Sequence, residues 1–206
     1  MPTTILQHSL SSHILSLLRD KTTPPERFRS LTQTVTRLLV AEATRKLPSR
    51  IVPITTPLEE TPGQQISVKL VAVPILRAGL GMLDAALEML PGATVGYVGM
   101  ERDEATAIAS AYYCKLPPLE NAHILMLDPM LATGGSAGAA AHELERAGAA
   151  HITLLCIVAA PEGVAHLADN YPKLHVITAA LDRELNASSY ILPGLGDFGN
   201  RLYGTL

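Results

Sequence analysis

The sequence predicts an α/β fold with a mostly parallel central sheet that is flanked by helices. From residue 68 onward, continuous apolar runs, which are typical of strands buried on both faces, alternate with segments of helical periodicity. A short turn rich in glycine and hydroxyl side chains follows one of these runs and leads into a helix, at residues 128–136. Strands that alternate with helices favour parallel pairing, and ligands of such sheets bind at the carboxyl ends of the strands.

The N-terminal third is predicted to contain two helices and an arm. A short helix is expected over residues 12–19. Thr23-Pro24-Pro25-Glu26 predicts the start of a longer helix, with Thr23 as the cap and a glutamate three residues later. Helical spacing of apolar residues continues this helix to about Lys46. Residues 50–66 mix prolines with polar alternation and predict loops or a hairpin, in the form of an arm.

The alternating region supplies the core of the predicted fold. The expected strands are residues 68–73, 94–100, 123–127, 151–159 and 174–181, and the expected helices are 80–90, 137–147 and 161–170. We therefore expect a single domain over residues 1–206. It comprises N-terminal helices and arm (1–66), an α/β core (67–181) and a C-terminal tail (182–206).

The composition disfavours several classes of protein. No apolar run is long enough to span a membrane, and the N-terminus lacks the basic start and apolar core of a signal peptide, so we expect a cytoplasmic protein without a membrane partner. A net charge of −3 argues against nucleic acid as the main partner. Cys114 and Cys156 lie far apart in apolar surroundings and are expected to be buried free thiols. The seven histidines form no recognisable metal-ligand pattern.

The turn after the strand at 123–127 has the features of a phosphate site. It runs from Asp128 to Thr133-Gly-Gly-Ser136, where a helix begins. The first amide groups of a helix have no partner within the helix and favour an anion, and Thr133 and Ser136 add hydroxyl donors. Asp128 is placed to accept hydrogen bonds from sugar hydroxyls, so the segment predicts a sugar phosphate ligand. The alternative is an ordinary capped strand–turn–helix junction; a P-loop is excluded because its lysine is missing.

Two arginines follow neighbouring predicted strands, Arg77 after the first and Arg102 after the second. Guanidinium groups at adjacent strand ends could hold a diphosphate bidentately, although a lone arginine in such a place is often part of a surface ion pair. Residues 103–111 lack a clear apolar anchor. They predict a lid over the site, with a plain surface loop as the alternative.

The tail contains Gly194, Gly196 and Gly199 in a GxGxxG spacing. A dinucleotide site is excluded by context, because only seven residues follow Gly199 and no βαβ unit can be built from them. The segment instead predicts an ordered loop whose exposed backbone amides and carbonyls can read the edge of a planar base. Asp197 is the one charged group within it.

Taken together, these segments resemble the uracil phosphoribosyltransferase family, a branch of the type I phosphoribosyltransferases. The resemblance covers nearly the whole chain, in residues 27–29, 42–44, 74–81, 128–136, 158–163 and 190–197. In the phosphoribosyl loop, Pro129 stands where many other type I members have a second acid, as it does in the uracil branch.

The resemblance implies transfer of phosphoribosyl from 5-phospho-α-D-ribose 1-diphosphate to uracil in pyrimidine salvage, giving UMP and diphosphate. It implies Mg²⁺ held mainly by substrate and water, GTP as an effector and a homodimer or homotetramer. The implied catalytic residues are Arg77, Arg102, Asp128 and Asp197. The phosphoribosyl diphosphate would contact these four and Pro129, Met130, Leu131, Ala132, Thr133, Gly134, Gly135 and Ser136, and uracil would contact Ile191, Gly196, Asp197 and Phe198.

The chain departs from the family pattern in places. The loop at Glu104-Ala-Thr-Ala-Ile-Ala lacks the family's proline, Arg183-Glu184 replaces a smaller pair, Ser189 stands where glycine is frequent and Asn200 where aspartate is common. Two other functions compete with the uracil enzyme: an RNA-binding regulator that senses pyrimidine nucleotides on the same fold, and a transferase for a purine or orotate. The low charge argues against the first, and the backbone-rich tail against the second.

Overall fold

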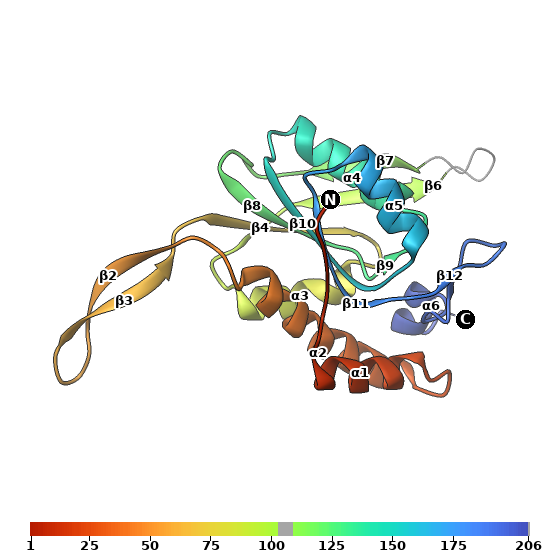
Figure 1. The fold of residues 1–206 in the computed structure, drawn as a ribbon, viewed down its shortest axis with the longest axis horizontal. Coiled ribbons are helices and arrows are strands. Elements are labelled where there is room, and N and C mark those ends of the chain that lie inside the picture. Colours follow the sequence, from red (N-terminus) through yellow and green to blue (C-terminus); the bar gives the residue numbers. More distant parts are fainter. Residues whose placement is uncertain (103–108, 206) are drawn as a thin grey trace.

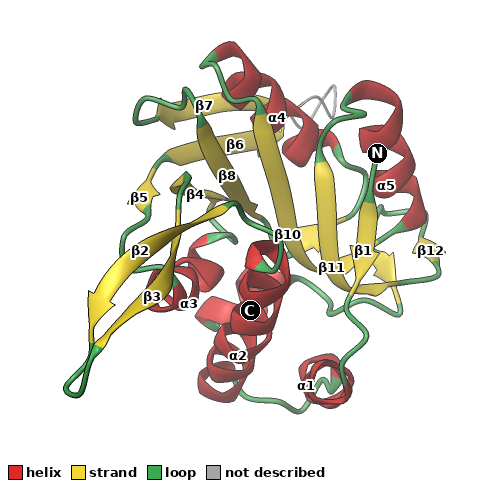
Figure 2. Ribbon diagram, turned by 60° about the vertical axis from the view of Figure 1, so that its left-hand side comes forward, coloured by secondary structure: helices red, strands yellow, loops and turns green. Residues whose placement is uncertain are grey.

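The computed structural model describes residues 1–102 and 109–205, without the side chains of residues 102, 109 and 110. A central sheet carries helices on both faces (Figures 1 and 2). In spatial order its strands are β1 (Thr3–Ile5), β11 (His175–Leu181), β10 (His151–Ala159), β8 (Ala122–Leu127), β4 (Lys69–Leu76), β6 (Tyr97–Arg102) and β7 (Ala109–Lys115). Neighbours along this path are parallel, except that β6 and β7 are antiparallel. The predicted fold class is confirmed.

Two apolar cores, one on each face of the sheet, explain the continuous apolar runs. Ile124 and Met126 of β8 pack toward α4 (Gly135–Arg146) and α5 (Pro161–Asn170), whereas Leu125 and Leu127 pack toward the opposite face. That face carries α1 (Ser9–Arg19), α2 (Pro25–Thr44) and α3 (Leu80–Met89). A strand buried on both faces needs an apolar residue at every position, and each fully buried large side chain contributes roughly 1.5–3 kcal/mol.

The N-terminal helices begin differently from the prediction. Helix α1 begins at Ser9, before the expected residue 12, because His8 Nδ1 accepts a hydrogen bond from the Leu10 amide and caps it. The expected capping of α2 by Thr23 is wrong. Pro24 is the cap residue and makes no side-chain cap bond, while the Thr23 hydroxyl donates to the Leu17 carbonyl near the end of α1. That hydroxyl therefore satisfies the carbonyl end of the preceding helix.

Most core elements lie where the sequence predicts them. β10 and α5 have the expected bounds, and β4 and β8 differ from them by a few residues at most. The strand expected at 94–100 is interrupted at Gly96, which separates β5 (Thr94–Val95) from β6. Residues 50–66 form a hairpin of β2 (Ser49–Thr55) and β3 (Glu60–Ile66), which projects from the body (Figure 1). No helix in the described part of the chain combines the length and apolarity of a membrane span.

The two cysteines differ in exposure. Cys156 is buried in β10, as predicted. The predicted burial of Cys114 is wrong, because this residue lies on β7, at the edge of the sheet, and is exposed. The apolar neighbours of Cys114 along the sequence did not reveal this edge position, in which β7 pairs with β6 and with no other described strand.

The direction of winding reverses between β4 and β8. From β4 the chain passes through α3 to β6 on one side, and β8 then returns to the other side of β4. α3 lies on one face of the sheet and α4 on the opposite face (Figure 2). Such a reversal leaves a crevice at the carboxyl ends of the two strands, which is the usual ligand position in open α/β sheets. Arg77 is the first residue after β4, and Asp128 is the first residue after β8.

Candidate active site

Two adjoining cavities lie at this reversal point. The larger has a volume of about 420 Å³, within the range of roughly 300–1,000 Å³ that is usual for small-molecule sites. The smaller, of about 50 Å³, is lined by residues 128 and 130–137. Met130 and Ala132 line both, so the two cavities are parts of one site. The larger cavity is lined by Arg77, Ala78, Met100, Met130, Ala132, Ser189, Tyr190, Ile191, Gly196, Asp197, Phe198, Gly199, Asn200, Tyr203 and Thr205.

The smaller cavity is the turn that the sequence singled out as a phosphate site. After Asp128 the chain forms β9 (Met130–Leu131), which pairs with β10, and then enters α4 through Gly134. Gly134 has a φ of +84°, and a Cβ there would lie 2.9 Å from His166 Cδ2. This position therefore requires glycine both for its backbone conformation and for its packing against α5. The first turn of α4 lines the cavity and directs the positive end of the helix dipole toward it.

Asp128 lies at the base of this cavity, where packing around its carboxyl group alters its ionisation. Desolvation by burial raises its pKa to about 7, and a hydrogen bond from the Met130 amide at 3.5 Å partly opposes that rise. The side chain keeps partial exposure to the cavity. Near neutral pH the carboxyl therefore exchanges between its charged and neutral forms, and an arriving cation or hydrogen-bond donor would favour the charged form.

Arg77 and Arg102, the two predicted diphosphate ligands, both lie at strand ends. Arg77 is exposed and lines the larger cavity, and the Leu76–Arg77 peptide bond is cis. The Tyr203 hydroxyl donates to the Arg77 carbonyl at 3.3 Å. Arg102 ends β6, but its side chain lies outside the described residues, so its role stays a prediction. The same holds for the predicted lid, of which residues 103–108 are not described and residues 109–111 belong to β7.

The tail closes the other side of the larger cavity. It forms the short pair β12 (Glu184–Leu185) and β13 (Ile191–Leu192), followed by α6 (Phe198–Tyr203). The expected loop at this position is therefore partly helical. Asp197 caps α6, because its carboxylate accepts a hydrogen bond from the Asn200 amide at 2.8 Å. Such a cap allows a six-residue helix in a segment too short for a βαβ unit.

The predicted base-binding residues line the cavity, but two of them direct their side chains into the core. Ile191 is 4% exposed and Phe198 is 3% exposed. The Phe198 ring packs edge-to-face against Phe28 of α2, with 5.2 Å between ring centroids. These side chains anchor the tail, and Gly196 and Gly199, which have no side chain, line the cavity beside them. The arrangement is suited to reading a planar base by backbone hydrogen bonds.

Sequence reasoning missed several residues that line the larger cavity. Tyr190 is 48% exposed there, and its position beside Ile191 was a signal that could have been used. Tyr203 and Thr205 gave no comparable signal, because they reach the cavity only through the unpredicted helix α6. Among the described residues, no group of three or more histidine, cysteine or acidic side chains could hold a metal ion.

Comparisons with known proteins agree with this geometry. The profile of the family described as uracil phosphoribosyltransferase matches residues 5–205. The uracil phosphoribosyltransferase of Streptococcus salivarius is 47% identical over 203 residues, which cover 98% of this chain and 97% of the relative. That of Bacillus cytotoxicus is 46% identical with the same coverage. The competing RNA-binding regulator finds no support among these matches.

Solved structures show the same fold. A protein from Aquifex aeolicus superimposes with a TM-score of 0.93 at 34% identity, covering 98% of this chain and 97% of that chain. A purine phosphoribosyltransferase from Pyrococcus horikoshii superimposes with a TM-score of 0.50 at 13% identity, covering 71% of this chain and 82% of that chain. At that level of identity, the second likeness shows the shared fold alone.

Proposed function

This chain belongs to the uracil phosphoribosyltransferase family, and on that premise we propose that it transfers phosphoribosyl from 5-phospho-α-D-ribose 1-diphosphate to N1 of uracil. The protein is thus a pentosyltransferase that forms UMP and diphosphate. The observation that carries the proposal is the junction at Met130 and Ala132, where the small cavity at the start of α4 meets the larger cavity lined by the tail. A nucleoside monophosphate has the same two ends, a phosphate and a planar base, joined by a sugar.

The phosphoribosyl part would lie along residues 128–136. The 5′-phosphate would occupy the smaller cavity, at the start of α4, and the ribose hydroxyls would donate to Asp128. Arg77, with Arg102, would hold the departing diphosphate, and Asp197 would contact the same substrate or its metal ion. These assignments rest on the placement of each residue at a strand end or on the cavity wall.

The reaction asks mainly for positioning and charge stabilisation. The bond between ribose C1 and the diphosphate oxygen breaks, N1 of uracil bonds to C1, and the N1 proton is released. Positive charge develops on the ribose and negative charge on the leaving group, so guanidinium groups beside the diphosphate favour the transition state. No residue needs to form a covalent bond to the substrate.

Magnesium fits this site as a partner of the substrate. The described residues offer no dense ligand cluster, whereas Asp197 is an exposed carboxylate on the cavity wall. Mg²⁺ usually keeps several waters and binds through one or two carboxylates together with substrate phosphates, which matches such a sparse donor set. When bound, the ion would neutralise charge on the diphosphate. Among the residues of the cavity wall, Asp197 would be the carboxylate that could bind the ion.

Uracil is favoured over cytosine by the backbone character of the base wall. Uracil presents acceptor, donor and acceptor along O2, N3–H and O4, whereas cytosine presents an amino donor in place of O4 and has no N3 proton. Backbone amides and carbonyls are fixed in their roles as donors and acceptors, so cytosine would leave buried groups unpaired. Such a mismatch discriminates by orders of magnitude.

A homodimer or homotetramer is supported by the projecting hairpin of β2 and β3. Its apolar side chains are strongly exposed, with Ile51 76% and Leu58 95% accessible. Apolar side chains on a projecting arm are typical of a surface that is covered in an assembly. GTP as an effector stays a prediction, and activity measured with and without GTP tests it.

The deciding experiment measures UMP formation from labelled uracil, phosphoribosyl diphosphate and Mg²⁺. Cytosine, orotate and hypoxanthine are assayed in parallel. Turnover selective for uracil is expected. Turnover selective for another base, or tight binding of phosphoribosyl diphosphate without any turnover, would refute the proposed reaction.

A further inference from the structure

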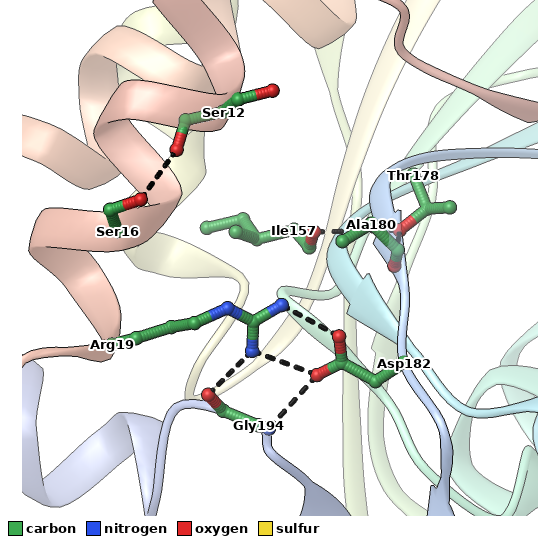
Figure 3. A network of polar contacts seen from close by, with 8 residues as sticks. All are labelled: Ser12, Ser16, Arg19, Ile157, Thr178, Ala180, Asp182 and Gly194. Carbon is green, nitrogen blue, oxygen red and sulfur yellow. Dashed lines mark hydrogen bonds and ion pairs between the residues drawn. The ribbon is translucent and has the colours of Figure 1, made fainter.

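An ion pair outside the cavity joins helix α1 to the tail. Arg19, the last residue of α1, donates two hydrogen bonds to Asp182, through Nη1 at 2.9 Å and Nη2 at 2.6 Å. Figure 3 shows that the same side chains also hold Gly194. Arg19 Nη1 donates to the Gly194 carbonyl at 2.8 Å, and the Gly194 amide donates to Asp182 Oδ2 at 2.9 Å. Both polar groups of the Gly194 backbone are thus fixed by this pair.

The pair is largely removed from water. The side chain of Asp182 is 4% exposed and that of Arg19 is 26% exposed. A buried carboxylate is costly unless it is paired, and Asp182 meets this need with Arg19 and the Gly194 amide. Because the guanidinium is planar and bidentate, the pair also defines the orientation of the groups it joins.

Asp182 connects the tail to the central sheet. It follows β11, and its amide donates to the Ala159 carbonyl at the end of β10 at 2.8 Å. Gly194 lies between Ile191 and Gly196, two residues that line the larger cavity. The contacts therefore run from the rigid sheet, through Asp182, to the middle of the segment that faces the base. The residues found along the cavity wall include neither Arg19 nor Asp182.

A second arginine, on α6, also joins the end of α1 to the tail. Arg201 of α6 donates to the Leu195 carbonyl at 2.9 Å, to the Asp20 carbonyl at 2.6 Å and to the Leu18 carbonyl. Leu18 and Asp20 flank Arg19, so Arg19 and Arg201 both connect the end of α1 to residues 194–195. These hydrogen bonds hold the base-facing segment against the end of helix α1.

We propose that Arg19 and Asp182 are positioning residues for recognition of the base: they hold Gly194 so that the backbone from Ile191 to Gly196 presents its hydrogen-bonding groups in the geometry of uracil. This inference rests on the proposed function, because it takes that segment as the uracil wall. It assigns to helix α1, which contributes no residue to the cavity wall, a role in substrate specificity.

The test compares Arg19→Gln with Arg37→Gln in steady-state kinetics, with each substrate varied in turn. Arg37 is a matched control, since it lies on α2 and pairs with Glu88 on the surface, away from the tail. Arg19→Gln is expected to raise KM for uracil about tenfold or more and KM for phosphoribosyl diphosphate by less than about threefold, because the lost contacts concern the base wall alone. Its preference for uracil over cytosine should fall, and Arg37→Gln should match the wild type.

Two milder variants guard against a failure to fold. Arg19→Lys keeps the charge but loses the planar fork, so its KM for uracil should lie between those of the wild type and Arg19→Gln. Asp182→Asn keeps an acceptor for the Gly194 amide and should also raise KM for uracil selectively. Thermal unfolding of each variant shows that the assays are run on folded protein. Equal changes in both KM values, or lowered unfolding temperature with unchanged KM for uracil, would overturn the inference.

Gly196→Ala separates this inference from the proposed function. It disturbs the cavity wall directly and leaves Arg19 and Asp182 in place, because Gly196 has a φ of +73°, which alanine rarely adopts. If Gly196→Ala raises KM for uracil and Arg19→Gln does not, the base wall is correct and the positioning role is wrong. If neither does while the wild type forms UMP, the base lies elsewhere and both assignments fail.

Discussion

The carboxyl group of Asp128 links the packing of the phosphoribosyl loop to pH. Burial raises its pKa from 3.8 to about 7. Between these two pH values the folded protein therefore keeps a proton that the unfolded chain has released. Its contribution to stability is therefore present at acidic pH and is lost as the pH rises through about 7. The difference corresponds to roughly 4 kcal/mol at most, and less in proportion to the partial exposure of the side chain.

Asp128→Asn tests this assignment. Denaturant unfolding of the wild type and the variant is compared at pH 5 and pH 8, and the wild type should lose stability relative to the variant at the higher pH. Parallel pH profiles would contradict the raised pKa. In the presence of both substrates the variant should lose more than about tenfold in kcat/KM, because the charged acceptor for the ribose hydroxyls is gone.

Ser189 carries a backbone conformation that glycine adopts more readily. Its φ is +61°, and Asn121 is its only non-glycine counterpart with positive φ in the described residues. Ser189→Gly should stabilise the fold by about 1 kcal/mol, since a side chain in the left-handed region costs roughly 1–2 kcal/mol and glycine loses some chain entropy. Thermal unfolding measures the change. Ser188→Gly, at a neighbour without positive φ, should give no gain; equal effects at both positions would refute the argument.

At the scale of the element, apolar runs predicted what the two cores bury. β10 and α5 were predicted to the residue because a strand with two buried faces and a helix starting with proline leave clear sequence patterns. β1 and β7 left none, because each is defined by hydrogen bonds to a strand distant in the sequence or by an edge position. α6 was missed because its six residues, of which Phe198 and Leu202 are buried, are too few to show a helical period in the sequence.

Helix α5 and the phosphoribosyl loop pack without a gap at Gly163. A Cβ there would overlap the Ala132 carbonyl oxygen and lie 3.1 Å from Leu131 Cγ. Gly163→Ala should destabilise the protein by about 1–3 kcal/mol and raise KM for phosphoribosyl diphosphate, because the loop must shift. Gly92→Ala is the control, since a Cβ there meets nothing within 4 Å. A stable Gly163→Ala variant with normal KM would show that the loop yields freely.

At the scale of the whole molecule, the sequence located one half of the site better than the other. Asp128 and Arg77 follow strands, and parallel strands bring their carboxyl ends to one edge, so their proximity was predictable. Tyr203 and Thr205 reach the same cavity because the tail folds back over it, a path that depends on contacts such as those of Arg19 and Arg201. The bond from Arg19 to Gly194 spans 175 residues, and those from Arg201 to Leu18 and Asp20 span 183 and 181, so they leave no local pattern.

The exposed apolar side chains of the projecting hairpin lead to a prediction about assembly. Ile51→Glu should lower the molar mass measured by light scattering. It replaces an apolar side chain, proposed to be covered in the assembly, with a charged one that is costly to bury. The far-ultraviolet circular dichroism spectrum should stay unchanged. Gln65→Glu, a polar position on the same hairpin, should keep the mass of the wild type. An unaltered mass for Ile51→Glu would exclude this part of the arm from the interface.

The unequal exposure of the two thiols leaves one cysteine of the native chain accessible to a thiol-directed label. Desolvation raises the pKa of both thiols, that of Cys156 to about 12, but Cys156 is buried and out of reach of a reagent, whereas Cys114 is exposed. A maleimide dye should therefore attach once per chain, on β7, opposite Val98 of β6. Mass spectrometry of the labelled protein would show one adduct, and Cys114→Ser would show none. The fluorescence of that dye could then follow substrate binding without any engineered cysteine.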